Sequence, residues 1–410
     1  MLRGIRVVAV FASFVVPAFA GGEMLVVNST EDLPDADLLD GVCDADLEAE
    51  GQQITLRAAV MHSNVVKGLD TIELPAGEYK LTIKGSGEDE GATGDLDVFD
   101  DLTITGAGAL DTIVNGKKAK DRVFETEQEL AVTFEDFTIK SGSAPTSNDD
   151  DDSEGGGIES ESDLTLRRMI ITKCKVGDAD GGGLAQSVGT LLVEDSLFSK
   201  NKSKDDGAGV DVASGTATFS RTSFVRNKAK GTGGGLEASP AVATVENCTF
   251  SANKATQGGG ALSVKEGSDI TLVNCTLAKN KSNDGSGIFE QLEDLVDDEI
   301  SLANCIVSNK SKTNYSGDGL TSLGGNLDSG TTCGFASEGD LSDADPRLSK
   351  LTSGPGEPPV HPLKDDSPCI DAADDLQCPK TDQLGQARVD VPDVGTSVCD
   401  MGAVEFQPEG

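Results

Sequence analysis

Three side-chain types that often build functional sites are almost missing from this chain. Its 410 residues include no tryptophan, two tyrosines and two histidines, His62 and His361. With two histidines, a histidine-rich metal centre and a Ser-His-Asp relay are both poor expectations. Because sugars commonly stack on aromatic rings, the lack of Trp and Tyr also argues against binding of neutral sugars.

Positive charge is scarce as well. The sequence holds 33 Lys and Arg against 71 Asp and Glu, which gives a formal net charge of −38. A nucleic-acid partner is excluded on this basis, because phosphate binding requires a basic face. Docking on anionic lipid is disfavoured for the same reason.

The first twenty residues have the composition of a signal peptide. Arg3 and Arg6 are followed by the apolar run Val7–Val16, and Ala18-Phe19-Ala20 fits the small-residue rule for cleavage. We expect cleavage after Ala20 and a secreted, extracellular or cell-surface protein. No later apolar run approaches the roughly 18 residues of a membrane helix, so no transmembrane segment is predicted in the mature chain.

Glycine clusters divide the middle of the chain into repeats. Their third members lie at positions 157, 183, 209, 235, 260 and 287, so the spacings are 26, 26, 26, 25 and 27. Between the clusters, segments that begin at positions 164, 191, 217, 243, 270 and 300 alternate apolar and polar residues. This alternation is the period of a β-strand. A unit of this length cannot bury its apolar side alone and must stack on its neighbours.

The repeat predicts an all-β fold, a right-handed parallel β-helix of about 26 residues per coil with N- and C-terminal caps. Equivalent residues would stack about 4.8 Å apart, and eight or nine coils would form a rod of about 40 Å. We expect an interior apolar column of Phe198, Phe224, Phe250, Leu277 and Ile306. A ladder of Asn247, Asn274 and Asn304, with cysteines 248, 275 and 305 beside it, is expected to satisfy buried turn groups.

Residues 24–144 resemble the CSLREA-type N-terminal domain of bacterial secreted β-helix proteins. The resemblance lies in the stretches Val27–Asp46, Thr55–Val60, Asp70–Ile83 and Gly94–Gly108. The family has a cysteine before its T-L-R triplet, where this chain has Ile54. The resemblance therefore leaves Cys43 without a local partner, as the odd one of nine cysteines.

Residues 315–406 resemble the choice-of-anchor Q domain that closes such rods. The similar stretches are Leu323–Phe335, Asp343–Leu351, Asp366–Ala372, Thr381–Arg388 and Cys399–Glu405. On this resemblance we place disulfides at Cys378–Cys399 first and Cys333–Cys369 second, although four cysteines allow three pairings. The organisation is then a signal peptide (1–20), an N-terminal cap with the first coils (21–144), Gly-rich repeats (145–314) and a C-terminal cap (315–410).

Acidic residues precede several glycine corners. Asp180 and Asp206 are 26 residues apart and should stack. Two carboxylates stacked one coil apart would repel each other, bind a cation between them or act as the acid pair of a glycosidase. With Arg168 and Arg221 as basic partners, they are candidates for catalysis, and a solvated acidic turn is the alternative. A second acidic cluster is a candidate calcium site with oxygen ligands; it contains Asp35, Asp37, Asp40, Asp44 and Asp46.

A basic column is the least expected pattern in so acidic a chain. Five lysines each follow an asparagine at the end of a repeat: Lys202, Lys228, Lys254, Lys281 and Lys310. Stacked about 5 Å apart, they form either a stripe neutralised by the corner aspartates or a track for an anionic glycan.

These patterns favour a secreted, non-enzymatic scaffold or adhesin that binds extracellular polysaccharide, a cell-envelope component or calcium. No other cofactor is expected. The alternative is a polysaccharide lyase or glycoside hydrolase acting on a uronate-containing polymer.

Overall fold

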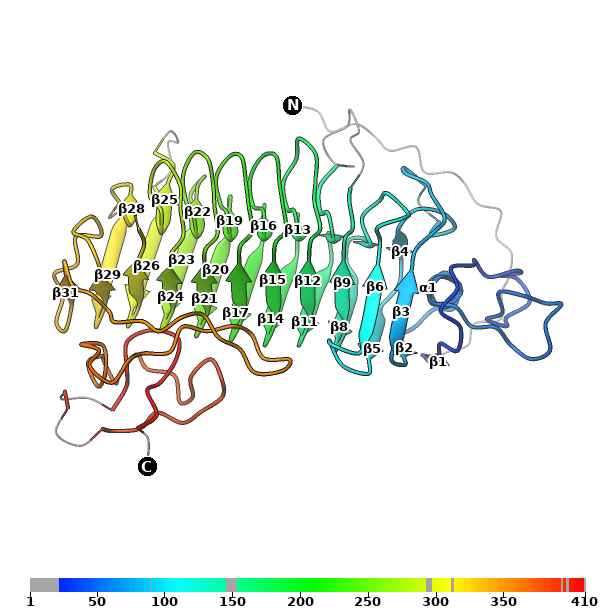
Figure 1. The fold of residues 1–410 in the computed structure, drawn as a ribbon. Coiled ribbons are helices and arrows are strands. Elements are labelled where there is room, and N and C mark those ends of the chain that lie inside the picture. The colour runs from blue at the N-terminus through cyan, green and yellow to red at the C-terminus, as the bar shows by residue number, and fades with distance from the viewer. Residues whose placement is uncertain are drawn as a thin grey trace.

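The computed structural model describes residues 22–88, 90–144, 153–292, 297–310, 313–391, 394–395 and 398–408. The predicted signal peptide lies outside these residues. The described chain forms a rod of three parallel sheets, with a loop-rich N-terminal cap at one end and a C-terminal segment along one side (Figure 1). No helix in this part of the chain is long and apolar enough to cross a membrane.

Each full coil contributes one strand to each sheet. The strands of sheet A are β1 (Met24–Val26), β2 (Asp70–Leu74), β5 (Leu102–Gly106), β8 (Ala131–Glu135), β11 (Asp163–Arg167), β14 (Thr190–Glu194), β17 (Thr216–Ser220), β20 (Val242–Glu246), β23 (Asp269–Val273), β26 (Glu299–Ala303) and β29 (Leu320–Gly324).

Sheet B follows sheet A along each coil. Its strands are β3 (Gly77–Lys80), β6 (Thr112–Asn115), β9 (Thr138–Lys140), β12 (Ile170–Thr172), β15 (Leu197–Ser199), β18 (Ser223–Val225), β21 (Thr249–Ser251), β24 (Thr276–Ala278), β27 (Ile306–Ser308), β30 (Leu327–Asp328) and β31 (Leu341–Ser342).

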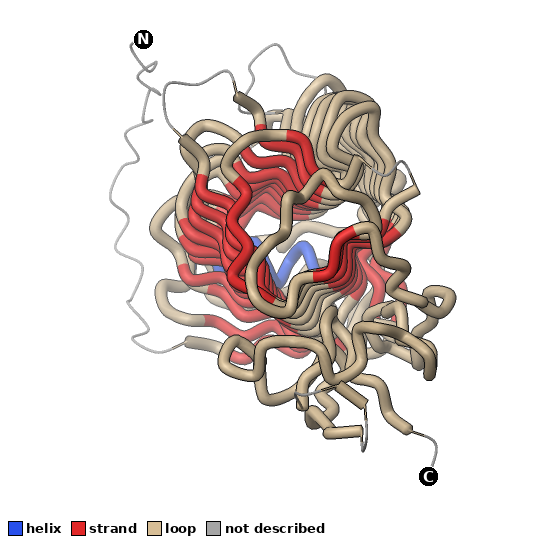
Figure 2. Tube along the Cα trace, turned by 90° about the vertical axis from the view of Figure 1, so that its left-hand side faces the viewer, coloured by secondary structure: helices blue, strands red, loops and turns tan. Residues whose placement is uncertain are grey.

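Sheet C lies beyond the glycine corners. Its strands are β4 (Leu96–Val98), β7 (Phe124–Thr126), β10 (Ile158–Ser160), β13 (Leu184–Gln186), β16 (Val210–Val212), β19 (Leu236–Ala238), β22 (Leu262–Val264), β25 (Ile288–Glu290) and β28 (Tyr315–Ser316). The three sheets surround the core when the rod is viewed along its axis (Figure 2).

The predicted parallel β-helix is thus confirmed. Sheets A and B each have eleven strands among the described residues, which exceeds the eight or nine coils expected. The additional coils come from both ends, where the repeat is weak in sequence. The predicted N-terminal cap (21–144), Gly-rich repeats (145–314) and C-terminal cap (315–410) all contribute strands to these sheets.

The aromatic stack of the core is confirmed with one correction. Phe198, Phe224 and Phe250 pair in register and are fully buried, with ring centroids 5.4 and 4.4 Å apart. Leu277 continues the column, but its partner is Val307 rather than the predicted Ile306. The coil after Leu277 has one residue fewer between its strand and the following asparagine, so alignment on the Asn-Lys pair shifts the register by one.

A continuous asparagine ladder lies inside the rod, in a different column from the one predicted. It consists of the residues before the lysines: Asn201, Asn227, Asn253, Asn280 and Asn309. Each backbone N–H donates to the side-chain oxygen of the next asparagine, at 2.7–3.0 Å for the four links. The side-chain amides of the first four donate to buried carbonyls of the preceding coil. The ladder therefore fixes the register of successive coils.

Helix α1 (Leu56–Val65) packs against the first coil at the N-terminal end. Thr55 caps its N-terminus by accepting a hydrogen bond from the N–H of Ala58. Arg57 is fully buried, and its guanidinium donates to Asp32 and to the carbonyls of residues 91, 94 and 95. The Thr-Leu-Arg triplet thus caps the helix and ties the loop that follows β3 to it.

The predicted column of Asn247, Asn274 and Asn304 has one link along the rod, from the amide of Asn304 to Oδ1 of Asn274 at 3.2 Å, and otherwise serves a different purpose. They adopt left-handed backbone conformations at the turn between sheets A and B. Their amides donate to the carbonyls of residues 381, 400 and 374. The C-terminal segment therefore lies along the side of the rod instead of only closing its end, and these turn residues hold it there (Figure 1).

The first predicted disulfide, Cys378–Cys399, is confirmed. The second, Cys333–Cys369, is wrong, because both thiols are free and buried. Cys333 packs in the main core of the rod, whereas Cys369 belongs to the separate core under the C-terminal segment. Cys43 is free and buried, as are the stacked Cys248, Cys275 and Cys305.

Replacing a central ladder residue should destabilise the rod. Asn253→Ala leaves the N–H of Asn227 and the carbonyl of Phe224 buried without their side-chain partner. We expect a loss of about 2–4 kcal/mol in the free energy of unfolding, since each unsatisfied buried group costs about 1–3 kcal/mol. Urea unfolding followed by circular dichroism measures the change. The exposed Asn283→Ala is the matched control, and equal losses in the two variants would contradict a ladder role.

Candidate functional site

The predicted lysine column exists and continues one coil further toward the N-terminus. Lys175, Lys202, Lys228, Lys254 and Lys281 form consecutive parallel bridges. The last four each follow an asparagine of the interior ladder, and Lys175 follows the buried Cys174. Because the asparagines are held inside the rod, the lysines that follow them project outward. The predicted Lys310 is exposed but does not take part in these bridges.

A second basic row runs beside the first. Lys173, Lys200 and Arg226 lie two residues before lysines of the first row and have left-handed φ angles near 60°. Together the two rows line an open groove of about 690 Å³, here called the lysine groove. Its lining residues are Lys173, Lys175, Lys200, Lys202, Arg226, Lys228, Ala252 and Lys254.

The lysine groove lacks the acidic partners that a neutralised stripe requires. Among the described residues, no carboxylate lies within 4.0 Å of a cation in its lining. The nearby ion pair Lys204–Asp178, at 3.6 Å, lies outside the groove. Further along, burial and then the charges of Lys310, Lys350 and Lys364 lower the pKa of Lys279. This face therefore holds cations beside one another.

The corner aspartates come together as the spacing predicts, but they have a partner that the sequence did not reveal. The N–H of Asp206 donates to Asp180 at 2.6 Å, and ligand atoms of Asp180, Asp205 and Asp206 lie within 4.8 Å of one another. Lys265 approaches Asp206 at 2.8 Å and also pairs with Glu237. The cluster therefore has an ammonium group of its own.

Sequence analysis missed an acidic column on sheet C. Asp97, Glu125 and Glu159 are stacked by the strand register, as are Asp211 and Glu237 two coils further on. Arg122 pairs with Glu125 and Glu159 in the first group. The sequence did contain a signal for this column. Glu159, Asp211 and Glu237 each stand two residues after a glycine cluster, and their spacings are multiples of 26 residues.

Burial controls the protonation of this column. Burial raises the pKa of Glu237 to about 8. In the neighbouring corner cluster it raises the pKa of Asp180 to about 6. The pKa of Asp211 is raised well above its usual value by burial and then by Glu237. In the first group, burial raises the pKa of Glu159 to about 9. Several of these carboxyls consequently carry protons near neutral pH, which lowers their mutual repulsion.

The basic partners predicted for catalysis lie on another edge of the rod. Arg168 and Arg221 occupy the left-handed turn between sheets A and B. Arg168 forms a bidentate pair with Asp136 at 2.7 and 2.6 Å, and Arg221 one with Asp195 at 2.7 and 2.8 Å. The structure therefore does not bring them together with Asp180 and Asp206, and the four residues do not form one active site.

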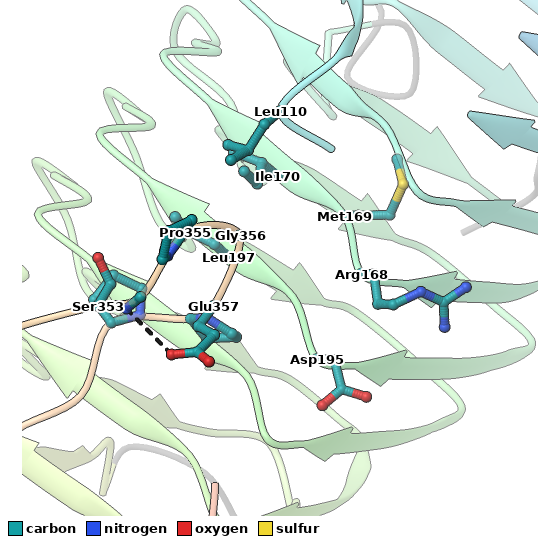
Figure 3. A pocket seen from close by; sticks show the side chains of 13 residues that line it. Leu110, Arg168, Met169, Ile170, Asp195, Leu197, Ser353, Pro355, Gly356 and Glu357 are labelled. Carbon is teal, nitrogen blue, oxygen red and sulfur yellow. Dashed lines mark hydrogen bonds between the residues drawn. The ribbon is translucent and has the colours of Figure 1, made fainter. Parts of the chain in front are cut away.

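A small hollow of about 240 Å³ lies next to this turn, where residues 353–359 approach sheet B. Figure 3 shows Pro355 and Gly356 facing Ile170 and Leu197, with Arg168 and Asp195 toward one side. The N–H of Gly354 donates to Glu357 at 3.2 Å within the covering segment. The guanidinium of Arg168 at this hollow is paired with Asp136.

The five N-terminal aspartates do not converge on one point. Their Oδ1 atoms accept hydrogen bonds from backbone N–H groups two residues later, an arrangement that closes local turns. Asp35 alone among them belongs to a described group with metal-binding geometry, which it shares with Cys43 and His62.

Residues 123–277 match a family model described as "Right handed beta helix region". The match agrees with the fold, a right-handed parallel β-helix. The match begins at β7 and extends to β24. It contains all lining residues of the lysine groove and all of the acidic column except Asp97. Neither the curated proteins nor the solved structures include a match to the chain.

The acidic column should make stability fall as pH rises. The folded state holds the proton of Glu237 up to about pH 8, whereas an ordinary glutamate loses it near 4.5. The stabilisation is therefore present at acid pH and is lost between these values. Glu237→Gln should reduce the slope of unfolding free energy against pH by up to about 1.4 kcal/mol per unit in that window.

Urea unfolding at a series of pH values, in the presence of a chelator, measures this slope. The exposed Glu299→Gln serves as the control. An unchanged slope in Glu237→Gln, or stability that rises with pH across the window in the parent protein, would contradict the assignment.

Proposed function

We propose that this protein is a secreted, non-enzymatic β-helix scaffold that binds an anionic extracellular polysaccharide along its lysine groove. The observation that carries the proposal is the groove itself: seven cationic side chains line one open hollow, and no described carboxylate neutralises them. A face of that kind on a chain of net charge −38 requires anions from elsewhere.

The geometry of the groove supports a polymeric ligand. Its cations repeat once per coil, at the inter-strand spacing of about 4.8 Å. A chain molecule with regularly spaced carboxylates or sulfates, lying along the rod axis, would contact successive coils in the same way. Long lysine side chains can adjust to such a ligand, because their ammonium groups rotate freely.

The export expected from the sequence agrees with the same proposal. The predicted signal peptide and the Cys378–Cys399 disulfide both suit an oxidising compartment outside the cytoplasm. A polysaccharide or another polyanion of the cell envelope would be available there. The acidic remainder of the surface would repel polyanions and so restrict binding to the groove.

The lysine groove can be tested by removing three of its cations. The triple variant Lys202→Ser, Lys228→Ser and Lys254→Ser should bind a polyuronate or sulfated polysaccharide about 10- to 100-fold more weakly. This estimate assigns about 0.5–1 kcal/mol to each exposed charge contact. Isothermal titration calorimetry at several salt concentrations measures the affinity, which should fall as salt increases.

A control with the same change in charge separates the groove from net charge. Lys84→Ser, Lys117→Ser and Lys118→Ser remove three exposed lysines outside the groove. This variant should bind like the parent protein. Equal affinity of the groove variant and the parent protein, without salt dependence, would refute the proposal.

A lyase or hydrolase acting on a uronate polymer is the competing candidate, and one observation favours it. Asp180 and Asp206 lie together, and the pKa of Asp180 is raised to about 6 by burial. Against it, Lys265 already occupies this cluster, and Arg168 and Arg221 lie on another edge. We expect no release of reducing ends or unsaturated uronates from anionic polymers, with calcium or with chelator. Release that Asp206→Asn abolishes would instead establish an enzyme.

A further inference from the structure

The N-terminal cap holds a mixed set of nitrogen, sulfur and oxygen donors outside the lysine groove. His62 comes from helix α1, whereas Asp35 and Cys43 come from the loop that follows β1. Ligand atoms of the three residues lie within 4.8 Å of one another. All three residues are buried: the exposed fraction is 2% for His62, 8% for Asp35 and 3% for Cys43.

Two of these donors face each other without a hydrogen-bond partner. Nδ1 of His62 and Oδ2 of Asp35 are both buried, and neither has a hydrogen-bond partner among the described residues. They are 3.7 Å apart, which is too long for a hydrogen bond. Asp35 uses its other oxygen, Oδ1, to accept from the N–H of Asp37. Buried polar atoms that remain unsatisfied in this way require a further partner.

The surroundings orient the imidazole as a ligand. Nε2 of His62 lies 3.3 Å from the carboxylate of Glu23, so Nδ1 remains available for coordination. A carboxylate on the far nitrogen is the usual outer partner of a metal-binding histidine. The carboxylates of Glu23 and Asp35 lie 3.3 and 3.7 Å from the two nitrogens of the imidazole and set up a negative field there. The same negative field favours a dication.

The donor types select the metal. Thiolate, imidazole and carboxylate together suit zinc, whereas calcium prefers oxygen ligands only. A tetrahedral zinc with bonds of about 2.0–2.2 Å to nitrogen and oxygen places those ligands about 3.4 Å apart. The observed 3.7 Å needs little adjustment. We propose that Asp35, Cys43 and His62 bind a zinc ion that fastens the N-terminal loop to helix α1, with a water as the fourth ligand.

Cobalt(II) provides a direct test on the mature chain. The protein, with its Cys378–Cys399 disulfide intact, is stripped with a chelator and titrated without oxygen, first with Co²⁺ and then with Zn²⁺. We expect one equivalent to produce the strong visible bands of tetrahedral cobalt and a near-ultraviolet thiolate charge-transfer band, both of which zinc abolishes. Octahedral cobalt spectra, or the absence of any saturable band, would overturn the proposal without recourse to variants.

Variants then identify the ligands. Cys43→Ser should lose the charge-transfer band, and His62→Gln and Asp35→Asn should lose tight zinc binding. Glu23→Gln, which alters only the outer partner, should weaken zinc binding about 10- to 100-fold while keeping the band. Asp37→Asn is the matched control, since Asp37 lies in the same loop outside the group. Circular dichroism verifies folding of each variant, and a thiolate band that persists in Cys43→Ser would refute the assignment.

Discussion

In-register stacking of successive coils is the constraint on which the rest of this structure depends. Parallel pairing places equivalent residues of neighbouring repeats about 4.8 Å apart, whatever their chemistry. The buried asparagine ladder enforces this register, because each side-chain oxygen can accept the next backbone N–H only when the coils are aligned. A charged residue that recurs in the repeat therefore lies next to residues of the same charge in the neighbouring coils. The fold must compensate for the resulting repulsion.

The acidic and basic columns meet this repulsion in different ways. On sheet C the carboxyls are mostly buried. Arg122 pairs with Glu159 and Lys265 with Glu237, while burial raises the pKa of Asp97 and Asp211, which favours their protonated forms. The lysines after the asparagine ladder are instead left in an open groove without described counter-charges. Internal compensation marks the first column as structural. The lack of it in the second makes the lysine groove the face that would gain most from an external anion.

The features of this structure that could be predicted from the sequence are those that recur with the repeat. The repeat located the strands of the middle coils, the aromatic stack and the lysine column, because each recurs at about 26 residues. It failed at Val307, where the stretch from the strand to the asparagine is one residue shorter, and where two asparagine columns compete for one role. The partners Lys265 and Arg122 were invisible because they approach the acids from loops. The site of Asp35, Cys43 and His62 is likewise formed by tertiary folding of the cap.

The left-handed turn between sheets A and B shows how one column can change purpose along the rod. From Asp136 to Arg221 its residues alternate in charge and pair with each other. From Asn247 onward they become asparagines, whose amides are free to bind another chain segment. The C-terminal segment binds there, through the carbonyls of residues 381, 400 and 374. Because the charged part is satisfied internally, it is the neutral part of the column whose side-chain amides donate to the docked segment, while residues 353–359 extend that segment past Arg168 and Asp195.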